Sequence, residues 1–348
     1  MWGRSPPPLP PTPAPLPEHS EAWYGTTLLL YVFAAWGALS VLTYLTPLLL
    51  SLVGRRVPNL RKLYGAEWAV VTGASSGIGK ALTAALAEQG INVVLVALDN
   101  DDLKMTAAEM RVGYPEREFR AIGADLADAS GAYMSELAAA TSDIHVSLLF
   151  NNAGFIVTGF FHATPLGKHL ANVHCNATSL LHITHHFLPL MYKSGRRGLV
   201  CFTSSSGGYL PSPFTTCYSA TKAFVSRFAT SLAVEAGPQG VDVVAVHPSP
   251  VRSSFLEGTS RFNIIDNFYR FSTEPDEVPD QIFRRCGNRF QVLADLGVPS
   301  VGLRLVTKLI DDNLFASAMT LAAPMLPDYV ENAAKAGMTN HLKKKPVQ

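Results

Sequence analysis

The sequence lacks an excess of charge of either sign. Its 348 residues include 28 Lys and Arg against 27 Asp and Glu, which gives a formal net charge of +1 at pH 7. Proteins that bind nucleic acid usually present a strongly basic face, so the charge balance predicts no nucleic-acid partner. The hydrophobic content of 48% is ample for the core of one large domain.

Cysteine is also scarce: the chain has four cysteines and no C-x-x-C spacing among them. This pattern predicts ordinary reduced thiols rather than a disulfide framework or a zinc site. Histidine is less scarce, and six of the ten histidines lie between residues 162 and 186. His182 with His185 or His186 has the spacing of metal ligands on a helix, but no acidic or cysteine partner is evident. We therefore predict no metal site.

Charge is absent altogether between Ala22 and Gly54. A single membrane span needs about 20 apolar residues, so residues 22–54 are predicted to form a transmembrane anchor. A shallow hairpin and a buried core helix are the alternatives. Four basic residues follow between 55 and 62, which places the C-terminal body of the protein in the cytosol. Residues 1–21 hold eight prolines and are predicted to form a disordered tail.

The stretch from Trp68 to Gly90 organises the rest of the chain. It is predicted to form a strand over 69–71, a glycine turn and a helix, with a second strand over 93–98. Such a crossover builds a parallel sheet and puts the turn at the carboxyl end of the first strand. Glycines there let a pyrophosphate approach the backbone and the helix N-terminus, so the G-x-x-x-G-x-G spacing predicts dinucleotide binding. The predicted cofactor contacts in the turn are Thr72, Gly73, Ser75, Ser76, Gly77, Ile78 and Gly79.

Strands and helices continue to alternate downstream. Helices are predicted at 103–111, 132–140, 170–191 and 218–235, and strands at 119–122, 146–150, 199–203 and 241–246. This alternation with short connections predicts an α/β fold, a Rossmann-like doubly wound parallel sheet preceded by the transmembrane helix. We assign the catalytic domain to residues 62–290 and a helical extension with a basic tail to residues 291–348. Asp125 follows the third strand, where it could bind an adenine amine or simply form a turn.

Tyr218 and Lys222 are the candidates for the chemistry. Residues four apart share one face of a helix, although this spacing alone is common in helices and usually has no function. A lysine ammonium, helped by the positive charge of an oxidised nicotinamide, favours the phenolate and pulls the tyrosine pKa towards neutrality. Tyr218 could then exchange a proton with a carbonyl oxygen. Ser205 could bond that oxygen, or merely begin a polar loop. Asn176 could hold a water in a proton relay with Lys222, or lie on the surface.

These motifs, together with Asn151-Asn152-Ala153-Gly154, resemble the short-chain dehydrogenase/reductase family in order and spacing over about residues 65–255. The resemblance implies hydride transfer between a nicotinamide and an alcohol or ketone. It makes Tyr218 the general acid-base, Lys222 its activator, Ser205 the donor to the substrate oxygen and Asn176 the relay member. Asn152, Asp125 and Val251 would lie at the cofactor, although Pro248-Ser249-Pro250-Val251 departs from the family's usual proline-glycine.

Two features bear on the choice between NAD(H) and NADP(H), and they point in opposite directions. Asp99, just after the second strand, could bond a ribose hydroxyl and would repel the 2′-phosphate of NADP. Ala97 stands where the family's NAD-binding members carry an acid, which favours NADP(H). The anchor followed by Tyr64-Gly65 and Trp68-Ala69-Val70-Val71 also resembles the branch of endoplasmic-reticulum 3-oxoacyl-CoA reductases and 17β-hydroxysteroid dehydrogenases. We expect NADP(H) rather than NAD(H).

These features predict a cytosol-facing enzyme of the endoplasmic-reticulum membrane that reduces a ketone on a lipid-like substrate, with 3-oxoacyl-CoA as the leading candidate. A steroid or retinoid dehydrogenase is the second hypothesis, and a silent nucleotide-binding scaffold the third. Expected partners are the substrate, membrane lipid and a second copy of the chain in a homodimer. Aromatic residues between 254 and 286 form either an apolar lid or ordinary packing, and residues 314–326 lie on a membrane surface or in the core.

Overall fold

The computed structural model describes residues 21–52, 56–257, 259, 262–288 and 291–338. The chain divides into two compact units, Met1–Leu45 and Thr46–Gln348. The predicted proline-rich tail and the three lysines at 343–345 lie outside the described residues.

The described part of the first unit is helical. Helix α1, Glu21–Leu52, contains the segment Trp23–Thr46, whose 24 residues are apolar and entirely unburied. At 1.5 Å per residue this segment is about 36 Å long, which exceeds the hydrocarbon core of a bilayer. Among the described residues it is the one helix long and apolar enough to cross a membrane. Because no residue of this segment is buried, the alternative of a core helix is wrong.

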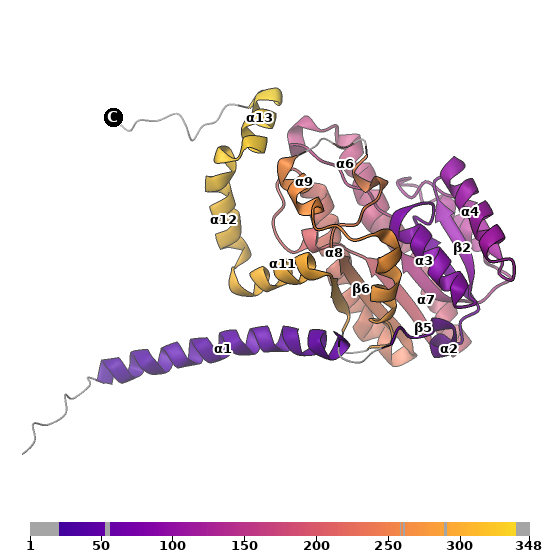
Figure 1. Ribbon diagram of the computed structural model, residues 1–348, viewed down its shortest axis with the longest axis horizontal. Coiled ribbons are helices and arrows are strands. Elements are labelled where there is room, and N and C mark those ends of the chain that lie inside the picture. The colour runs from indigo at the N-terminus through magenta and orange to yellow at the C-terminus, as the bar shows by residue number, and fades with distance from the viewer. Residues whose placement is uncertain (1–20, 53–55, 258, 260–261, 289–290, 339–348) are drawn as a thin grey trace, which may run out of the picture. The chain divides into compact units, whose positions relative to one another are not determined.

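The second unit is built on a seven-stranded parallel sheet in the order β3-β2-β1-β4-β5-β6-β7 (Figure 1). The strands are β1 Trp68–Thr72, β2 Asn92–Ala97, β3 Phe119–Gly123, β4 Val146–Asn151, β5 Gly198–Thr203, β6 Val241–Pro248 and β7 Leu293–Leu296. The strand order reverses between β1 and β4, and in such sheets ligands bind outside the carboxyl ends of the strands at this point. The predicted Rossmann-like fold is confirmed.

Alternate residues of the strands pack into two separate hydrophobic cores. In β1, Ala69 and Val71 belong to one buried cluster, and Trp68 and Val70 belong to the other. This alternation is the two-residue period of a strand with both faces covered. Every residue of β1 and β4 is buried, which explains why these strands read as continuous apolar runs.

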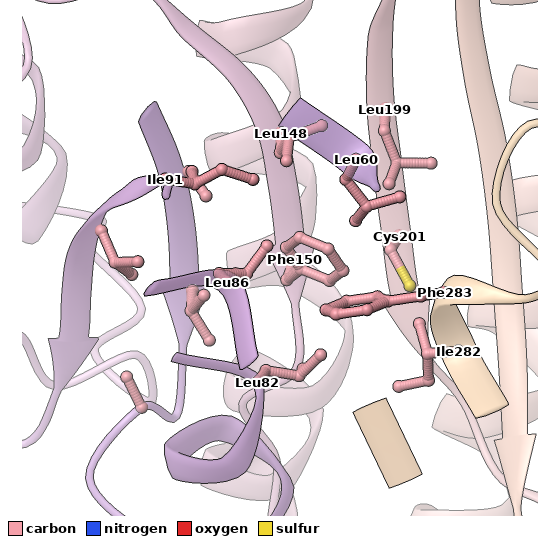
Figure 2. Close-up of a cluster of buried hydrophobic side chains, with 14 of the residues drawn as sticks. Leu60, Leu82, Leu86, Ile91, Leu148, Phe150, Leu199, Cys201, Ile282 and Phe283 are labelled. Carbon is pink, nitrogen blue, oxygen red and sulfur yellow. The ribbon is translucent and has the colours of Figure 1, made fainter. Parts of the chain in front are cut away.

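Helices cover both faces of the sheet. The first cluster (Figure 2) is filled from α2 Leu60–Tyr64, α3 Gly77–Glu88, α4 Asp101–Gly113 and α10 Val278–Phe283. In it the rings of Phe150 and Phe283 lie 6.3 Å apart. The second cluster is filled from α5 Tyr133–Ala140, α7 Ser179–Ser194 and α8 Thr216–Ala236. The remaining helices are α6 Leu166–Val173, α9 Asn263–Tyr269, α11 Val298–Leu309, α12 Asp312–Ala322 and α13 Pro327–Lys335.

The structure differs from the predictions in two places. Strand β7 pairs with β6, so the sheet continues beyond the expected end of the catalytic domain at residue 290. Four residues that include Asp295 give too little apolar pattern to predict a strand. The expected helix at 170–191 begins earlier, at Leu166, and a π-helical turn, His174–Thr178, lies between α6 and α7. Such turns insert one residue into a helix and are frequent at functional sites.

Candidate active site

The glycine turn between β1 and α3 is closely packed. Gly73 has a φ of 64°, and a Cβ added there would lie 2.9 Å from the Cα of Ala153. A Cβ on Gly79 would overlap the carbonyl oxygen of Gly73. Helix α3 therefore begins directly against the turn, with its first N–H groups at the carboxyl edge of the sheet. This cradle of bare backbone at a helix N-terminus fits the pyrophosphate of a dinucleotide.

Thr72 and Asn152 tie three strand ends together. The Thr72 hydroxyl accepts hydrogen bonds from the backbone N–H groups of Asn152 and Ala153, both at 2.9 Å. The Asn152 amide donates to the Thr72 carbonyl at 3.2 Å, and its Oδ1 accepts from Thr203 Oγ1 at 3.0 Å. Asn152 thus holds β1, β4 and β5 in register beside the cradle, a role that the sequence did not indicate.

The outlying cofactor candidates differ in their surroundings. Asp99 is exposed beyond β2, with Lys104 Nζ 3.8 Å from its carboxylate. Asp125 accepts a hydrogen bond from the N–H of Ala127 at 2.9 Å, as the plain turn interpretation expects. Val251 is buried and forms a β-bridge with Thr273. Two residues further on, the Ser253 Cβ lies 3.2 Å from the position of a Cβ on Gly77, so the loop after β6 closes onto the glycine turn.

Tyr218, Ser205 and Lys222 lie together at the carboxyl end of β5. Tyr218 is in the first turn of α8 and lies beside the Ser205 side chain: a Cβ added at Gly207 would lie 3.4 Å from Ser205 Oγ and 3.6 Å from the Tyr218 ring. Lys222 is one turn further along α8, and its Nζ lies 5.7 Å from the centre of the Tyr218 ring. The ammonium donates to the Thr203 carbonyl at 2.8 Å. The predicted catalytic residues are therefore brought together.

Asn176 lies in the π-helical turn and is 1% exposed, so the alternative of a surface asparagine is wrong. Its Oδ1 accepts from the N–H of Phe155 at 3.0 Å, and its Nδ2 donates to the Phe155 carbonyl at 2.9 Å. A Cβ added at Gly154 would lie 3.1 Å from Asn176 Oδ1 and 3.3 Å from Lys222 Nζ. Asn176 and Lys222 thus flank a single point beside the bare backbone of Gly154.

The comparison with known proteins agrees with this geometry. The family model for short chain dehydrogenases matches residues 67–263, which include the glycine turn, Asn176, Ser205, Tyr218 and Lys222. The chain belongs to the short-chain dehydrogenase family. The fold of this family of oxidoreductases binds NAD(P), and the cradle found here fits that cofactor.

Relatives of this short-chain dehydrogenase act on different substrates. A very-long-chain 3-oxoacyl-CoA reductase of Podospora anserina is 35% identical over 61% of the chain, and the match spans 64% of the fungal protein. A 7beta-hydroxysteroid dehydrogenase of Collinsella aerofaciens is 30% identical over 68% of the chain and 88% of the bacterial protein. The structure of a Sphingobium yanoikuyae short-chain dehydrogenase in complex with NADPH matches with a TM-score of 0.59 and 26% identity, covering 69% of this chain and 92% of that one.

The protonation of this short-chain dehydrogenase's site differs from the expectation. Burial raises the pKa of Tyr218 to about 12, and the hydrogen bond with Ser205 only partly opposes it. Burial also lowers the pKa of Lys222 to about 8, which leaves it mostly cationic at neutral pH. Within the protein alone, desolvation of the phenol outweighs the ammonium at 5.7 Å from its ring. The expected lowering of the tyrosine pKa is thus not a property of the chain by itself.

Two further aromatic residues lie near Tyr218. The ring of Phe255 lies 5.8 Å from that of Tyr218, and Tyr269 is close enough to raise the pKa of Tyr218 slightly further. Phe283, by contrast, is 1% exposed in the core. Ordinary packing, one of the two interpretations of the 254–286 segment, therefore holds for Phe283, and the apolar lid stays a prediction.

A second group of rings, the aromatic cluster, joins four segments of the chain. Phe214 stacks on Phe262 at 4.5 Å and contacts Phe160 at 5.2 Å, and Phe160 contacts Tyr329 of α13, also at 5.2 Å. Phe214 is the one non-glycine residue with positive φ, 67°, in the described chain. This conformation is strained for a bulky side chain. The sequence pattern gave no indication of this cluster, because its members come from four segments.

A buried polar chain behind Lys222 was also missed. Ser204 Oγ donates to the Lys222 carbonyl at 2.8 Å and lies 2.9 Å from Ser226 Oγ. Ser226 Oγ in turn lies 2.8 Å from His247 Nε2. These hydrogen-bonded side chains fix the turn of α8 that carries Lys222 to the end of β6. The sequence showed only that His247 follows a predicted strand, and it indicated no function for this histidine.

We expect His247 to make stability pH-dependent. Burial, followed by the charge of Arg304, lowers the pKa of His247 from 6.5 to about 3, despite an Asp295 carboxylate 3.7 Å from its Nδ1. Between about pH 3 and pH 6.5 the unfolded chain binds a proton at His247 that the folded chain does not, which favours unfolding. The stability that depends on a neutral His247 is therefore fully present above pH 6.5. As the pH falls below that value, the free energy of unfolding should decrease by about 1.4 kcal/mol per pH unit from this group.

Denaturant unfolding at a series of pH values measures this slope. His247→Gln should flatten it between pH 6.5 and pH 4, whatever its effect on absolute stability. His185→Gln is the control, because His185 is exposed on α7. Equal slopes for the wild type and His247→Gln would contradict the prediction.

Proposed function

We propose that this protein is a membrane-anchored oxidoreductase that uses NADP(H) to reduce a ketone on a lipid-like substrate, with 3-oxoacyl-CoA as the leading candidate. The observation that carries the proposal is the convergence of Tyr218, Ser205, Lys222 and Asn176 beside the glycine turn, at the carboxyl edge of the sheet. A silent scaffold would have no physical need for this arrangement, so we place the scaffold hypothesis last.

In this proposal each residue has one task. Ser205 donates to the ketone oxygen and orients it against the Tyr218 hydroxyl. The glycine turn between β1 and α3 would hold NADPH, which would supply the hydride for the carbonyl carbon. Tyr218 gives its proton to the oxygen, which yields an alcohol and leaves a phenolate. The Lys222 ammonium, held by the Thr203 carbonyl, stabilises that phenolate, and Asn176 orients a water from which the proton returns.

Three features support a lipid-like substrate. The rings of Phe255 and Tyr269 give the site an apolar cover. Curated relatives such as the P. anserina protein are very-long-chain 3-oxoacyl-CoA reductases. Segment Trp23–Thr46 is long and apolar enough to hold the enzyme in the membrane from which such a substrate comes. We place the enzyme in the endoplasmic reticulum, facing the cytosol, as a homodimer.

A steroid substrate is the second candidate. The C. aerofaciens 7beta-hydroxysteroid dehydrogenase matches over 88% of its own length, which is more than the fungal reductases do. Retinoids share the apolar character of steroids but have no similar support. The choice between acyl-CoA and steroid therefore rests on the relatives and on the anchor.

The preference for NADP(H) has two supports. A structural neighbour binds NADPH. In addition, Lys104 lies 3.8 Å from the Asp99 carboxylate, so its ammonium offsets the repulsion that Asp99 would exert on a 2′-phosphate. Asp125, whose Oδ1 accepts from Ala127, would contact the adenine amine, which NAD and NADP share.

The test uses the full chain in phospholipid nanodiscs. Nicotinamide absorbance is followed with NADPH or NADH against short and long 3-oxoacyl-CoAs, oxosteroids and retinoids, and mass spectrometry identifies the products. We expect a long-chain 3-hydroxyacyl-CoA with NADPH. Turnover of oxosteroids alone would favour the second candidate. Cofactor binding without turnover of any ketone would favour the scaffold.

A further inference from the structure

Helices α11, α12 and α13 form a C-terminal arm, residues 298–335, along the outside of the second unit (Figure 1). No residue of α12, Asp312–Ala322, is buried. This includes its large apolar side chains: Leu314 is 64% exposed and Leu321 is 68% exposed, and Met325 just beyond is 84% exposed. Soluble proteins seldom leave such a group uncovered, so this surface indicates an interaction.

Both ends of the arm are fixed, so the exposure of α12 does not come from a loose chain. At the first end, Arg304 of α11 lies over the Tyr209 ring at 4.6 Å. At the other end, Asp328 of α13 is buried, and its Oδ1 accepts from the N–H of Asn263 at 3.0 Å and from the Asn263 amide at 2.8 Å. Helix α12 is therefore held with its outer side presented to the surroundings.

The exposed residues form one stripe. Leu314, Ala318 and Leu321 are spaced at intervals of four and three, which places them on one side of α12, and Met325 follows in the 3-10 turn Ala323–Met325. Residues 313–327 contain no charged side chain. The eleven residues of α12 are about 16 Å long, too short to span a bilayer but suited to lying in its surface.

We propose that this stripe of α12 docks on a phospholipid surface. The inference rests on the membrane anchor of the proposed function, since segment Trp23–Thr46 of the same chain would keep lipid at high local concentration. The charge of the following sequence fits the same occupant: Lys343, Lys344 and Lys345 come after α13 and attract anionic headgroups. A protein partner for a stripe without charge or hydrogen-bonding groups would gain little specificity.

Docking has a consequence for the active site. Tyr329 of α13 belongs to the aromatic cluster, and Phe214 of that cluster is four residues before Tyr218. A stripe seated on lipid therefore sets the substrate side of the site close to the membrane surface. A lipid-like ketone would then reach Tyr218 without crossing water.

Photo-crosslinking tests the docking without relying on catalysis. The full chain is reconstituted in phosphatidylcholine vesicles, with and without phosphatidylserine, that contain a phospholipid with a diazirine in its acyl chain. Mass spectrometry then locates the labelled peptides. We expect label in residues 312–326 as well as in the 23–46 segment, none in α4, and more label at 312–326 with phosphatidylserine.

Two variants sharpen the test. Leu314→Gln with Leu321→Gln should lower labelling of 312–326 by about tenfold or more, because each buried leucine favours an apolar environment strongly. Labelling of 23–46 and thermal stability should stay unchanged, since both side chains are exposed. Val112→Gln is the matched control, because Val112 is 83% exposed on α4 and should change nothing.

Label confined to 23–46, or crosslinks of α12 to a second protein chain in place of lipid, would overturn the proposal. Equal labelling of 312–326 in the double variant and the wild type would also overturn it. Failure of the proposed enzymatic function has a different signature. A protein without turnover whose α12 is labelled retains the docking surface, whereas an active enzyme without label there does not have it.

Discussion

Tyr218→Phe should reduce kcat by about 10²–10⁴-fold, the usual contribution of a positioned general acid. The substitution removes the hydroxyl and leaves the ring, which lies beside Ser205 and whose centre is 5.8 Å from that of Phe255. Folding and cofactor affinity should therefore be retained, and the loss should fall on kcat rather than on KM. Steady-state kinetics with the best substrate of the panel, together with a cofactor titration, measure both quantities.

Tyr192→Phe provides the control for the loss of a phenol hydroxyl. Tyr192 lies near the C-terminal end of α7, and its pKa is raised mainly by burial, as at Tyr218 but less strongly. Its substitution should leave kcat unchanged. If Tyr218→Phe kept more than about a tenth of the wild-type kcat, the proton would have to come from another group, and the assignment of the general acid would be wrong.

Gly79→Ala should cost the protein both stability and cofactor affinity. The added Cβ would overlap the Gly73 carbonyl and lie 2.8 Å from Asn152 Nδ2, so α3 would have to move away from the turn and from the ends of β1 and β4. Overpacking of this kind costs about 1–3 kcal/mol in the free energy of unfolding. Because the displaced helix start is the proposed pyrophosphate site, NADPH affinity should fall by about 100-fold, equivalent to about 2.7 kcal/mol.

Denaturant unfolding and a fluorescence titration of NADPH measure these two effects. Gly113→Ala is the matched control, because a Cβ at that helical glycine meets nothing within 4 Å. It should be neutral or stabilise the protein by up to about 1 kcal/mol. Wild-type stability and affinity in Gly79→Ala would show that the turn can relax, and the packing argument would then fail.

The sequence predicted the sheet well because the physical signal was strong there. Central parallel strands are buried on both sides, so eight of the eleven residues of β1 and β4 are apolar. The catalytic residues could be predicted because their motifs resemble those of the short-chain dehydrogenase family in order and spacing. The separation of Tyr218 and Lys222 by one helical turn is common in helices and would not have been enough alone. Strand β7 was missed because its four residues include Asp295, whose carboxylate contacts Tyr209 and lies near His247.

The rest depended on contacts between distant segments. The polar chain behind Lys222 joins Ser204, Ser226 and His247, and no local pattern relates them. The π-helical turn that buries Asn176 has no compositional signature, so a surface position was an equal alternative. The pKa of Tyr218 could not be predicted either, because it is set chiefly by desolvation, which follows from the packing of Phe255, Tyr269 and their neighbours.

The left-handed conformation of Phe214 has a consequence for engineering this protein. A glycine would occupy a φ of 67° without strain, so a search for thermostable variants would tend to test glycine at this position. That change would remove the ring that stacks on Phe262 and contacts Phe160, and with it one link between α13 and the segment leading to Tyr218. Because Phe214 is buried, the loss of this packing would cost about 3–5 kcal/mol, more than the about 1–3 kcal/mol that relief of the backbone strain would return, so glycine at position 214 should lower the stability of the protein.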